Sequence, residues 1–446
     1  MSPDPAERAG VFRYRSWTID AANSRIIGEY ELDRWHFREE FGFTPSGAWD
    51  SPAVRHAARL LYLMAGVSYY KAGAPPVIDL GDTPISDRER EFLTEYYLQG
   101  LGEFAYRAGL SLDGLQLVGG RDFPQPAAGK PLGHGPLIPF GGGLDSIVTV
   151  ELLRATGRLD GARLFVVNKA ADRFDAIERP AALTGLPISR ATRSLDPQIL
   201  RSAELGFFNG HVPVTGIISA MACVTAALEG LDAVVMSNEW SSSSATLVTD
   251  DGRSVNHQYS KSADFENGFR TVMSACPAAP DYFSLLRPWT ELWIARYFAD
   301  HASGYLLDFR SCNRAFHINP EHRSATWCGR CDKCAFIDLM LAPFVPADRL
   351  SQVFSGAEPL MNPSLQHQFD TLLGLVPGAK PWECVGDVAE SRVAARMAAR
   401  LPKRADSLLP GLAAAADQFS DPSVEALMSP MSGHHIPDRY VSPDLG

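Results

Sequence analysis

The sequence lacks the long, purely hydrophobic run that a membrane-spanning helix requires. Its longest stretch without Asp, Glu, Lys or Arg includes residues 207–228, and this part contains Asn209, Gly210, His211 and Pro213. We interpret it as a buried helix of an α/β domain and expect no membrane insertion. The first residues of the chain also lack the apolar core of a secretory signal, which predicts a cytoplasmic protein.

The chain also lacks a surplus of basic residues. It has 41 Lys and Arg against 52 Asp and Glu, a net charge of −11, and no Lys/Arg block. Because nucleic-acid binding depends on neutralising phosphates, this balance argues against a nucleic-acid partner. The 446 residues, 46% hydrophobic and 21% charged, are typical of a globular protein with two or three domains.

Cysteines are few, and their spacing does not resemble a disulfide framework. Four of the seven form the pattern C-x15-C-x2-C-x2-C. Thiolates two residues apart on a knuckle that turns at Gly329 can bind one tetrahedral Zn²⁺, and four sulfurs leave no open coordination position. The pattern therefore predicts a structural zinc site, with redox-active thiols or an iron–sulfur cluster as the alternatives. The predicted ligands are Cys312, Cys328, Cys331 and Cys334.

Two common nucleotide-binding patterns, GxxxxGK[ST] and GxGxxG, are missing from the glycine-rich loop. Instead, PLIPFGGGLDS places Gly141, Gly142 and Gly143 between a predicted strand (136–140) and a predicted helix (144–156). Three glycines let several backbone N–H groups approach a phosphate, and the helix N-terminus adds a partial positive charge. The loop predicts phosphate binding; the alternative is a turn that only packs the strand against the helix.

The residues after the glycines belong to the same predicted site. Leu144, Asp145 and Ser146 fall in the first helical turn. Asp145 can cap the helix or meet a phosphate-bound Mg²⁺, and Ser146 can donate a hydrogen bond to a phosphate.

Strands and helices alternate after residue 131, which predicts an α/β fold with a parallel sheet and helices on both faces. We expect strands at 136–140, 163–167 and 231–236, and helices at 144–156, 174–184 and 212–228. Before this region, strand-like runs (11–19, 24–32) and helical patterns (51–65, 86–108) predict an N-terminal α+β, substrate-contacting domain at 1–130, with a Gly/Pro-rich linker at 116–135. The nucleotide-binding domain then covers 131–345, and a helical extension covers 346–446 and ends in a surface strap at 432–446.

The loop GGGLDS resembles the SGGxDS pyrophosphate loop of the N-type ATP pyrophosphatases, such as asparagine synthetase, GMP synthetase and 7-cyano-7-deazaguanine synthase. Gly141 stands where that family usually has serine, so one side-chain hydroxyl is lost while the backbone cradle is kept. The resemblance implies an adenine nucleotide α-hydrolase-like fold that uses ATP and Mg²⁺ to transfer AMP to a substrate oxygen. It also implies that Asn168 lies beside the adenosine, and the cysteine pattern is similar to the zinc site of the 7-cyano-7-deazaguanine synthases.

A polar segment, residues 236–269, begins where the strand at 231–236 ends. This is the edge at which ligands bind in an open parallel sheet. For any one of its residues a solvated loop is the alternative, but the run NHQYSKS favours a ligand-contacting surface. The predicted substrate-binding residues are Asn238, Asn256, Gln258, Tyr259, Ser260 and Ser262.

Taken together, FGGGLDS, GHVPVTG, SNE, VNHQYSKS and CGRCDKC resemble the UDP-N-acetylmuramoyl-L-alanyl-L-glutamate epimerase (MurL) family. The resemblance implies ATP- and Mg²⁺-dependent inversion of the terminal L-glutamate of a UDP-linked muramyl dipeptide. The alternatives are a synthetase of the same superfamily that makes an amide, nitrile or thio product, and an ATP-binding module without turnover.

The base that moves the proton is not specified by a motif. Lys261, His257 and Glu239 are the candidates beside Asp145 in the catalytic set. Racemases without a cofactor commonly use paired thiols, but Cys223, Cys276 and Cys384 sit among apolar or small residues in the sequence. We expect these three to be inert core cysteines.

Overall fold

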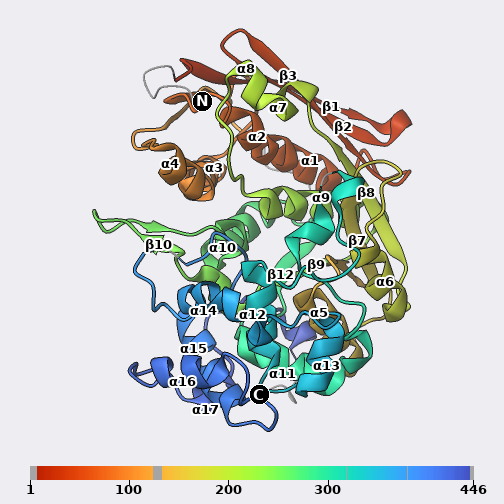
Figure 1. Cartoon of the computed structure of the whole chain (residues 1–446). Helices are drawn as coiled ribbons and strands as arrows, with labels where there is room; N and C mark the ends of the chain where they lie inside the picture. Colours follow the sequence, from red (N-terminus) through yellow and green to blue (C-terminus); the bar gives the residue numbers. More distant parts are fainter. Residues whose placement is uncertain (1–7, 124–132, 318, 379, 442–446) are drawn as a thin grey trace.

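A ten-stranded sheet runs through the computed structural model, which describes residues 8–123, 133–317, 319–378 and 380–441. Its strand order is β12-β9-β6-β7-β8-β3-β2-β1-β4-β5, and a separate hairpin, β10-β11, projects from the side of the molecule (Figure 1). The strands are β1 (Val11–Asp20), β2 (Arg25–Leu32), β3 (Trp35–Gly42), β4 (Val77–Asp79), β5 (Gln116–Val118), β6 (Pro136–Pro139), β7 (Arg163–Asn168), β8 (Ile188–Ser194), β9 (Ala233–Met236), β10 (Leu247–Val248), β11 (Ser254–Val255) and β12 (Asp281–Ser284).

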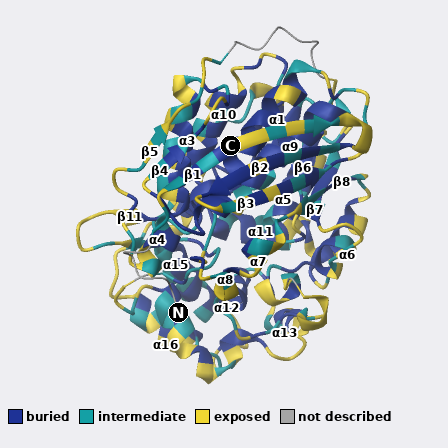
Figure 2. Cartoon of the chain, turned by 90° about the horizontal axis from the view of Figure 1, so that it is seen from above, coloured by how far each residue is buried: buried dark blue, intermediate teal, exposed yellow. Residues whose placement is uncertain are grey.

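One half of the sheet, β12-β9-β6-β7-β8, is entirely parallel. Neighbouring side chains of β6 point to opposite faces: Leu137 packs in one hydrophobic core and Ile138 in the other. The first core includes α1 and α9, and the second includes α5 and α11, so helices cover both faces as predicted. Figure 2 shows these strands as a largely buried layer inside a rim of exposed loops.

The helices explain why the strands are buried, because their apolar faces cover the sheet. The expected helix at 86–108 is two helices, since α3 ends at Gly100 and α4 begins at Gly102. The helices are α1 (Pro52–Ala65), α2 (Val67–Tyr70), α3 (Asp87–Gly100), α4 (Gly102–Ala108), α5 (Leu144–Ala155), α6 (Asp175–Thr184), α7 (Pro197–Leu200), α8 (Ser202–Leu205), α9 (Val214–Glu229), α10 (Ala263–Met273), α11 (Glu291–His301), α12 (Asp332–Leu341), α13 (Ala347–Val353), α14 (Gln366–Leu372), α15 (Val388–Ala399), α16 (Leu409–Ala416) and α17 (Val424–Leu427).

The N-terminal strands extend the parallel half rather than forming a sheet of their own. β3 pairs antiparallel with β8, with Gly42 opposite Thr192, and the buried Glu39 bonds Arg193 at 2.6 Å. The sheet therefore crosses the expected boundary at residue 130, and the three-part division of the chain stays a prediction. In the expected linker, residues 116–118 form strand β5, so that part of the prediction is wrong, and residues 124–132 lie outside the described residues.

The C-terminal region is helical as expected, from α13 to α17 (Figure 1). After it, the described part of the tail lies over the edge of the sheet: Arg439 bonds Asp232 and Asp281, and Tyr440 packs against Phe283. This agrees with a surface strap up to residue 441; the last five residues lie outside the described part. Within the described residues, no helix combines the length and hydrophobicity needed to cross a bilayer.

Candidate active site

A cavity of about 400 Å³ opens at the carboxyl ends of β6, β7 and β9. From β6 the next strands, β7 and β8, are added on one side, whereas β9 and β12 lie on the other, so the order of the strands reverses at this point. Open parallel sheets bind their ligands at such a position. From the predicted set, the cavity is lined by Gly141, Gly143, Asp145, Ser146, Asn238 and Lys261.

The glycine loop has the geometry of a backbone cradle. Gly142 has a φ of +73°, and a β-carbon there would lie 2.1 Å from the carbonyl oxygen of Ala176. Gly143 is the N-cap of α5 and gives it no side-chain cap, so the first N–H groups of that helix have no capping side chain. The backbone N–H of Arg310 donates to the Gly142 carbonyl at 3.0 Å and fixes the loop from the other side.

The two residues that follow the glycines differ in orientation. The Leu144 side chain is buried in the hydrophobic core, so only its backbone can contact a ligand. Ser146 lines the cavity, and its hydroxyl donates to the Gly143 carbonyl at 3.1 Å.

Three cationic side chains line the cavity: Lys261, Arg310 and Lys333. Burial, reinforced by the negative charge of Glu239, raises the pKa of Asp145 to about 6. Glu239 itself is buried behind the wall and does not line the cavity. A cavity with three cations beside a glycine cradle is suited to a polyanionic ligand.

The cavity also holds an unpaired polar atom. Ser237 follows β9 and lines the cavity, and within the described residues its buried hydroxyl has no hydrogen-bond partner. A buried hydroxyl without a partner is costly, which makes this position suitable for a ligand contact. By contrast, Asn168 donates to the Asp172 carbonyl of its own loop, and the wall beside it consists of Phe165, Val166 and Val167.

The predicted substrate-binding residues do not all meet at this cavity. Asn256, Tyr259 and Ser262 line a second cavity of about 780 Å³, between α3 and α10. Ser262 also caps α10 by accepting from the Phe265 N–H at 3.2 Å. Ser260 is buried and lines neither of these two cavities, nor does Gln258, whose amide donates to the Val385 carbonyl at 3.1 Å.

Cys384 is not the inert core cysteine that the sequence predicts. It lines the glycine-loop cavity beside Lys261 and His257. Burial raises the pKa of a thiol, yet these two cations outweigh burial and lower the pKa of Cys384 to about 6. The neighbours of Cys384 in the sequence gave no sign of this, because both cations come from a loop more than 100 residues earlier. Cys223 and Cys276 are fully buried with raised pKa values, which agrees with inert core positions.

His257 bonds Glu103 and lies beside His211, and the sequence patterns did not select either residue as part of the site. Its Nδ1 lies 2.5 Å from Oε2 of the buried Glu103, on α4, and His211 Nδ1 lies 3.6 Å from the same oxygen. The two imidazole rings are 4.5 Å apart. Burial lowers the pKa of His257, but bonds to Cys384 and Glu103 outweigh it and raise that pKa to about 9. His211 lies in the segment GHVPVTG, which was its only signal; Glu103 had none.

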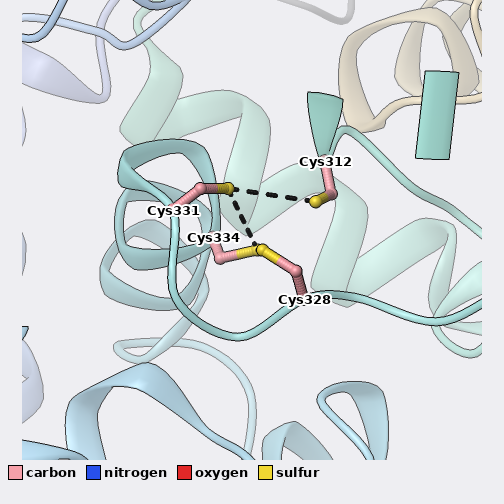
Figure 3. A group of neighbouring side chains, drawn as sticks. All are labelled: Cys312, Cys328, Cys331 and Cys334. Carbon is pink, nitrogen blue, oxygen red and sulfur yellow. Dashed lines mark hydrogen bonds between the residues drawn. The ribbon is translucent and has the colours of Figure 1, made fainter. Parts of the chain in front are cut away.

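The four clustered cysteines converge on one point (Figure 3). Their sulfurs all lie within 4.8 Å of one another, with separations of 3.5 Å, 3.5 Å and 3.9 Å for three of the pairs. Four thiolates at about 2.3 Å from one zinc ion would be about 3.8 Å apart, so this donor set fits tetrahedral zinc. Cys312 comes from a separate loop, so a shared zinc ion would tie that loop to the start of α12.

This cluster shapes the wall of the cavity. Cys312 stands between Ser311 and Asn313, which both line it, and Lys333 on α12 directly precedes Cys334. The knuckle turns at Gly329, whose φ is +63° and whose β-carbon would lie 2.5 Å from the Ala357 carbonyl.

Comparison with known proteins gives the family. A model of the MurL N-terminal domain matches residues 4–285, and a model of the MurL C-terminal domain matches residues 308–426. The chain belongs to the MurL family. Three curated members are named UDP-N-acetyl-alpha-D-muramoyl-L-alanyl-L-glutamate epimerase. The one from Xanthomonas oryzae is 37% identical over 98% of this chain and 97% of its own length, the one from Salinispora tropica is 37% identical over 88% and 86%, and the one from a Micromonospora strain is 35% identical over 99% of each.

Membership of the MurL family confirms the resemblance found in the sequence, and with it the expectation of an enzyme of the isomerase class. No solved structure matches the chain. The α/β fold with a largely parallel sheet is therefore established by the structure, while the finer assignment to the pyrophosphate-loop fold stays a prediction.

Proposed function

We propose that the protein inverts the terminal L-glutamate of UDP-N-acetylmuramoyl-L-alanyl-L-glutamate to D-glutamate in peptidoglycan precursor synthesis, with ATP as its second substrate. The substrate follows from the names of the three relatives. The role of ATP is supported by one observation: a single cavity joins a glycine cradle, three cationic side chains and the thiol of Cys384.

The chemistry explains why an epimerase would need a phosphate-binding loop. The hydrogen on a carbon next to a carboxylate is very weakly acidic, because its removal places a second negative charge beside the first. Attaching AMP to the α-carboxylate neutralises it and makes the carbonyl electron-withdrawing. Each tenfold gain in acidity corresponds to about 1.4 kcal/mol, so activation lowers the barrier to proton removal greatly.

In the proposed reaction an oxygen of the α-carboxylate attacks the α-phosphorus of ATP, and the bond from that phosphorus to the departing pyrophosphate breaks. The backbone at residues 141–143 holds the phosphates, and Lys261, Arg310 and Lys333 offset their charge. Asp145 would hold Mg²⁺, which supplies further positive charge at the phosphates. After inversion, water attacks the carbonyl carbon of the adenylate and releases AMP and the free acid.

The zinc site has a structural role in this proposal. Four thiolates leave no coordination position for substrate, so the ion would fix the positions of Ser311, Asn313 and Lys333 without taking part in the reaction. A cytoplasmic location follows from the same proposal, because UDP-linked precursors and ATP must both be present.

The test is incubation of the protein with ATP, Mg²⁺ and the UDP-muramyl dipeptide, without ammonia or a sulfur donor. We expect pyrophosphate release together with D-glutamate in the hydrolysed product, measured by chiral chromatography. Pyrophosphate release with unchanged L-glutamate would favour a synthetase of the same superfamily. Inversion without any consumption of ATP would refute the proposed activation.

A further inference from the structure

Outside the glycine loop, the wall of the cavity includes Cys384, and two further side chains follow behind it. Cys384 lies beside His257, and Nδ1 of that imidazole lies 2.5 Å from Oε2 of Glu103. The three come from a loop before α15, a loop after β11 and helix α4, so only the folded chain brings them together.

We propose that the Cys384 sulfur is the base that removes the proton from the carbon being inverted, and that Glu103 positions His257 against it. This inference rests on the proposed function and names the proton-transfer group of the same site. The thiolate takes the α-proton, and the electron pair of the C–H bond moves onto the carbonyl oxygen of the adenylate. A water molecule donates a proton to the other face of that carbon while the electron pair returns from the carbonyl oxygen, which completes the inversion. The thiol then gives its proton to the hydroxide that is left.

The charges around Cys384 keep its sulfur in the thiolate form that this step needs. Lys261 and Lys333 face it from the other walls of the cavity, and His257 is held protonated by Glu103. His211 and Glu383 also face the imidazole; burial lowers the pKa of His211 to about 4, so it is neutral beside the imidazolium. The pair is therefore thiolate and imidazolium between about pH 6 and about pH 9.

The buried anchor of this chain is Glu103, whose side chain is 5% exposed. Its Oε1 accepts from Arg107 at 3.0 Å while Oε2 faces His257, so both oxygens are occupied. Glu103, His211 and His257 also have the donor atoms of a metal site. Two ligands about 2.0–2.2 Å from one metal ion would be about 3 Å or more apart, whereas these two atoms are 2.5 Å apart, a direct hydrogen bond.

The experiment follows two signals in the full-length enzyme in D₂O: pyrophosphate release and deuterium incorporation at the α-carbon. For Cys384→Ser we expect pyrophosphate release within about threefold of the unmodified enzyme and deuterium incorporation lowered at least about 100-fold. Cys276→Ser, a buried thiol outside the cavity, is the matched control and should change neither signal. Unchanged deuterium incorporation in Cys384→Ser, or equal loss of both signals in a folded variant, would overturn the inference.

If the proposed activation by ATP is wrong, the two signals differ from those expected if the role of Cys384 is wrong. If ATP is not cleaved by the unmodified enzyme, deuterium incorporation still reports whether Cys384 moves the proton. Iodoacetamide labelling of the native enzyme provides a readout that needs no substitution. Alkylation of Cys384 should rise with a midpoint near pH 6, whereas a midpoint at the ordinary thiol value of about 8.5 would contradict the inference.

The variant Glu103→Gln tests whether Glu103 positions His257 or only stabilises the fold. Without the carboxylate the pKa of His257 falls, so the alkaline limit of deuterium incorporation should move at least about one pH unit below its place near pH 9. A purely structural role for Glu103 would lower the rate without moving that limit, and this result would overturn the positioning role.

Discussion

At position 142 the glycine loop holds a backbone conformation that other residues rarely adopt, and a β-carbon there would meet the Ala176 carbonyl. Gly141 differs, because nothing lies within 4 Å of its β-carbon position. We expect Gly142→Ala to lower the free energy of unfolding by about 1–3 kcal/mol and Gly141→Ala to change it by less than about 0.5 kcal/mol. Urea unfolding followed by circular dichroism measures both, and equal stability of the two variants would contradict this role of Gly142.

Some residues of the candidate site could be predicted from the sequence, and others could not. The glycines and Asp145 were found because their chemistry depends on neighbours within a few positions. Cys384, Glu103 and Arg310 were missed because what matters for each is a contact with a distant segment. The neighbours of Cys384 in the sequence, PWE before it and VGD after it, carry no positive charge and therefore did not indicate the cations that face it in the fold.

Among the secondary-structure elements, helix α12 links the cysteine cluster to the cavity. Its Lys333 is buried, lines the cavity and donates to the Cys384 carbonyl, whereas Arg330 on the same knuckle is exposed. We expect Lys333→Met to raise the KM for ATP about tenfold, equivalent to about 1.4 kcal/mol, because one of three cations is lost. Steady-state pyrophosphate release measures this, with Arg330→Met as control; an equal KM in both variants would argue against phosphate binding by Lys333.

The position of the cysteine cluster at the start of α12 indicates what metal removal should do. Freshly purified protein should contain one zinc per chain, by elemental analysis. Chelation should cost about 3 kcal/mol or more and lower the Tm by several degrees, because the loop that carries Cys312 is freed from α12. The backbone bond from Arg310 to Gly142 connects that loop to the cradle, so ATP affinity should fall as well. Iron in place of zinc, or an unchanged Tm, would contradict the zinc assignment.

Strand and helix patterns predicted most elements near the cavity, since β6, α5, β7, α9 and β9 each lie within two residues of their expected bounds. The N-terminal strands β1 and β2 were found in the same way. β8 and β12 were not expected. Pairing with neighbouring strands stabilises both, and β8 carries two arginines whose partners come from elsewhere in the chain.

Over the whole molecule, the pairing of β3 with β8 makes the N-terminal segment part of the main sheet. Arg193 closes this junction by bonding the fully buried Glu39 and the hydroxyl of Ser68. We expect Arg193→Ala to lower the free energy of unfolding by about 3–5 kcal/mol, because Glu39 would be left buried without a cation. The exposed pair of Arg201 and Glu204 provides the control, and Arg201→Ala should cost less than about 0.5 kcal/mol.

Thermal unfolding measures both variants, and a cost below about 1 kcal/mol for Arg193→Ala would contradict the importance of this junction. The sequence predicted separate units here, because a turn-rich stretch near residue 130 is typical of a domain boundary. A pairing between strands about 150 residues apart leaves no mark on local patterns.

In the proposed reaction the α-carboxylate of the substrate attacks the α-phosphorus of ATP in the cavity formed by the glycine loop. Substrate labelled with ¹⁸O in that carboxylate tests it directly, with mass spectrometry of the AMP produced. We expect one ¹⁸O atom in the AMP, because the attacking oxygen stays on phosphorus when water cleaves the adenylate at carbon. AMP without label, or D-glutamate formed without AMP, would contradict it.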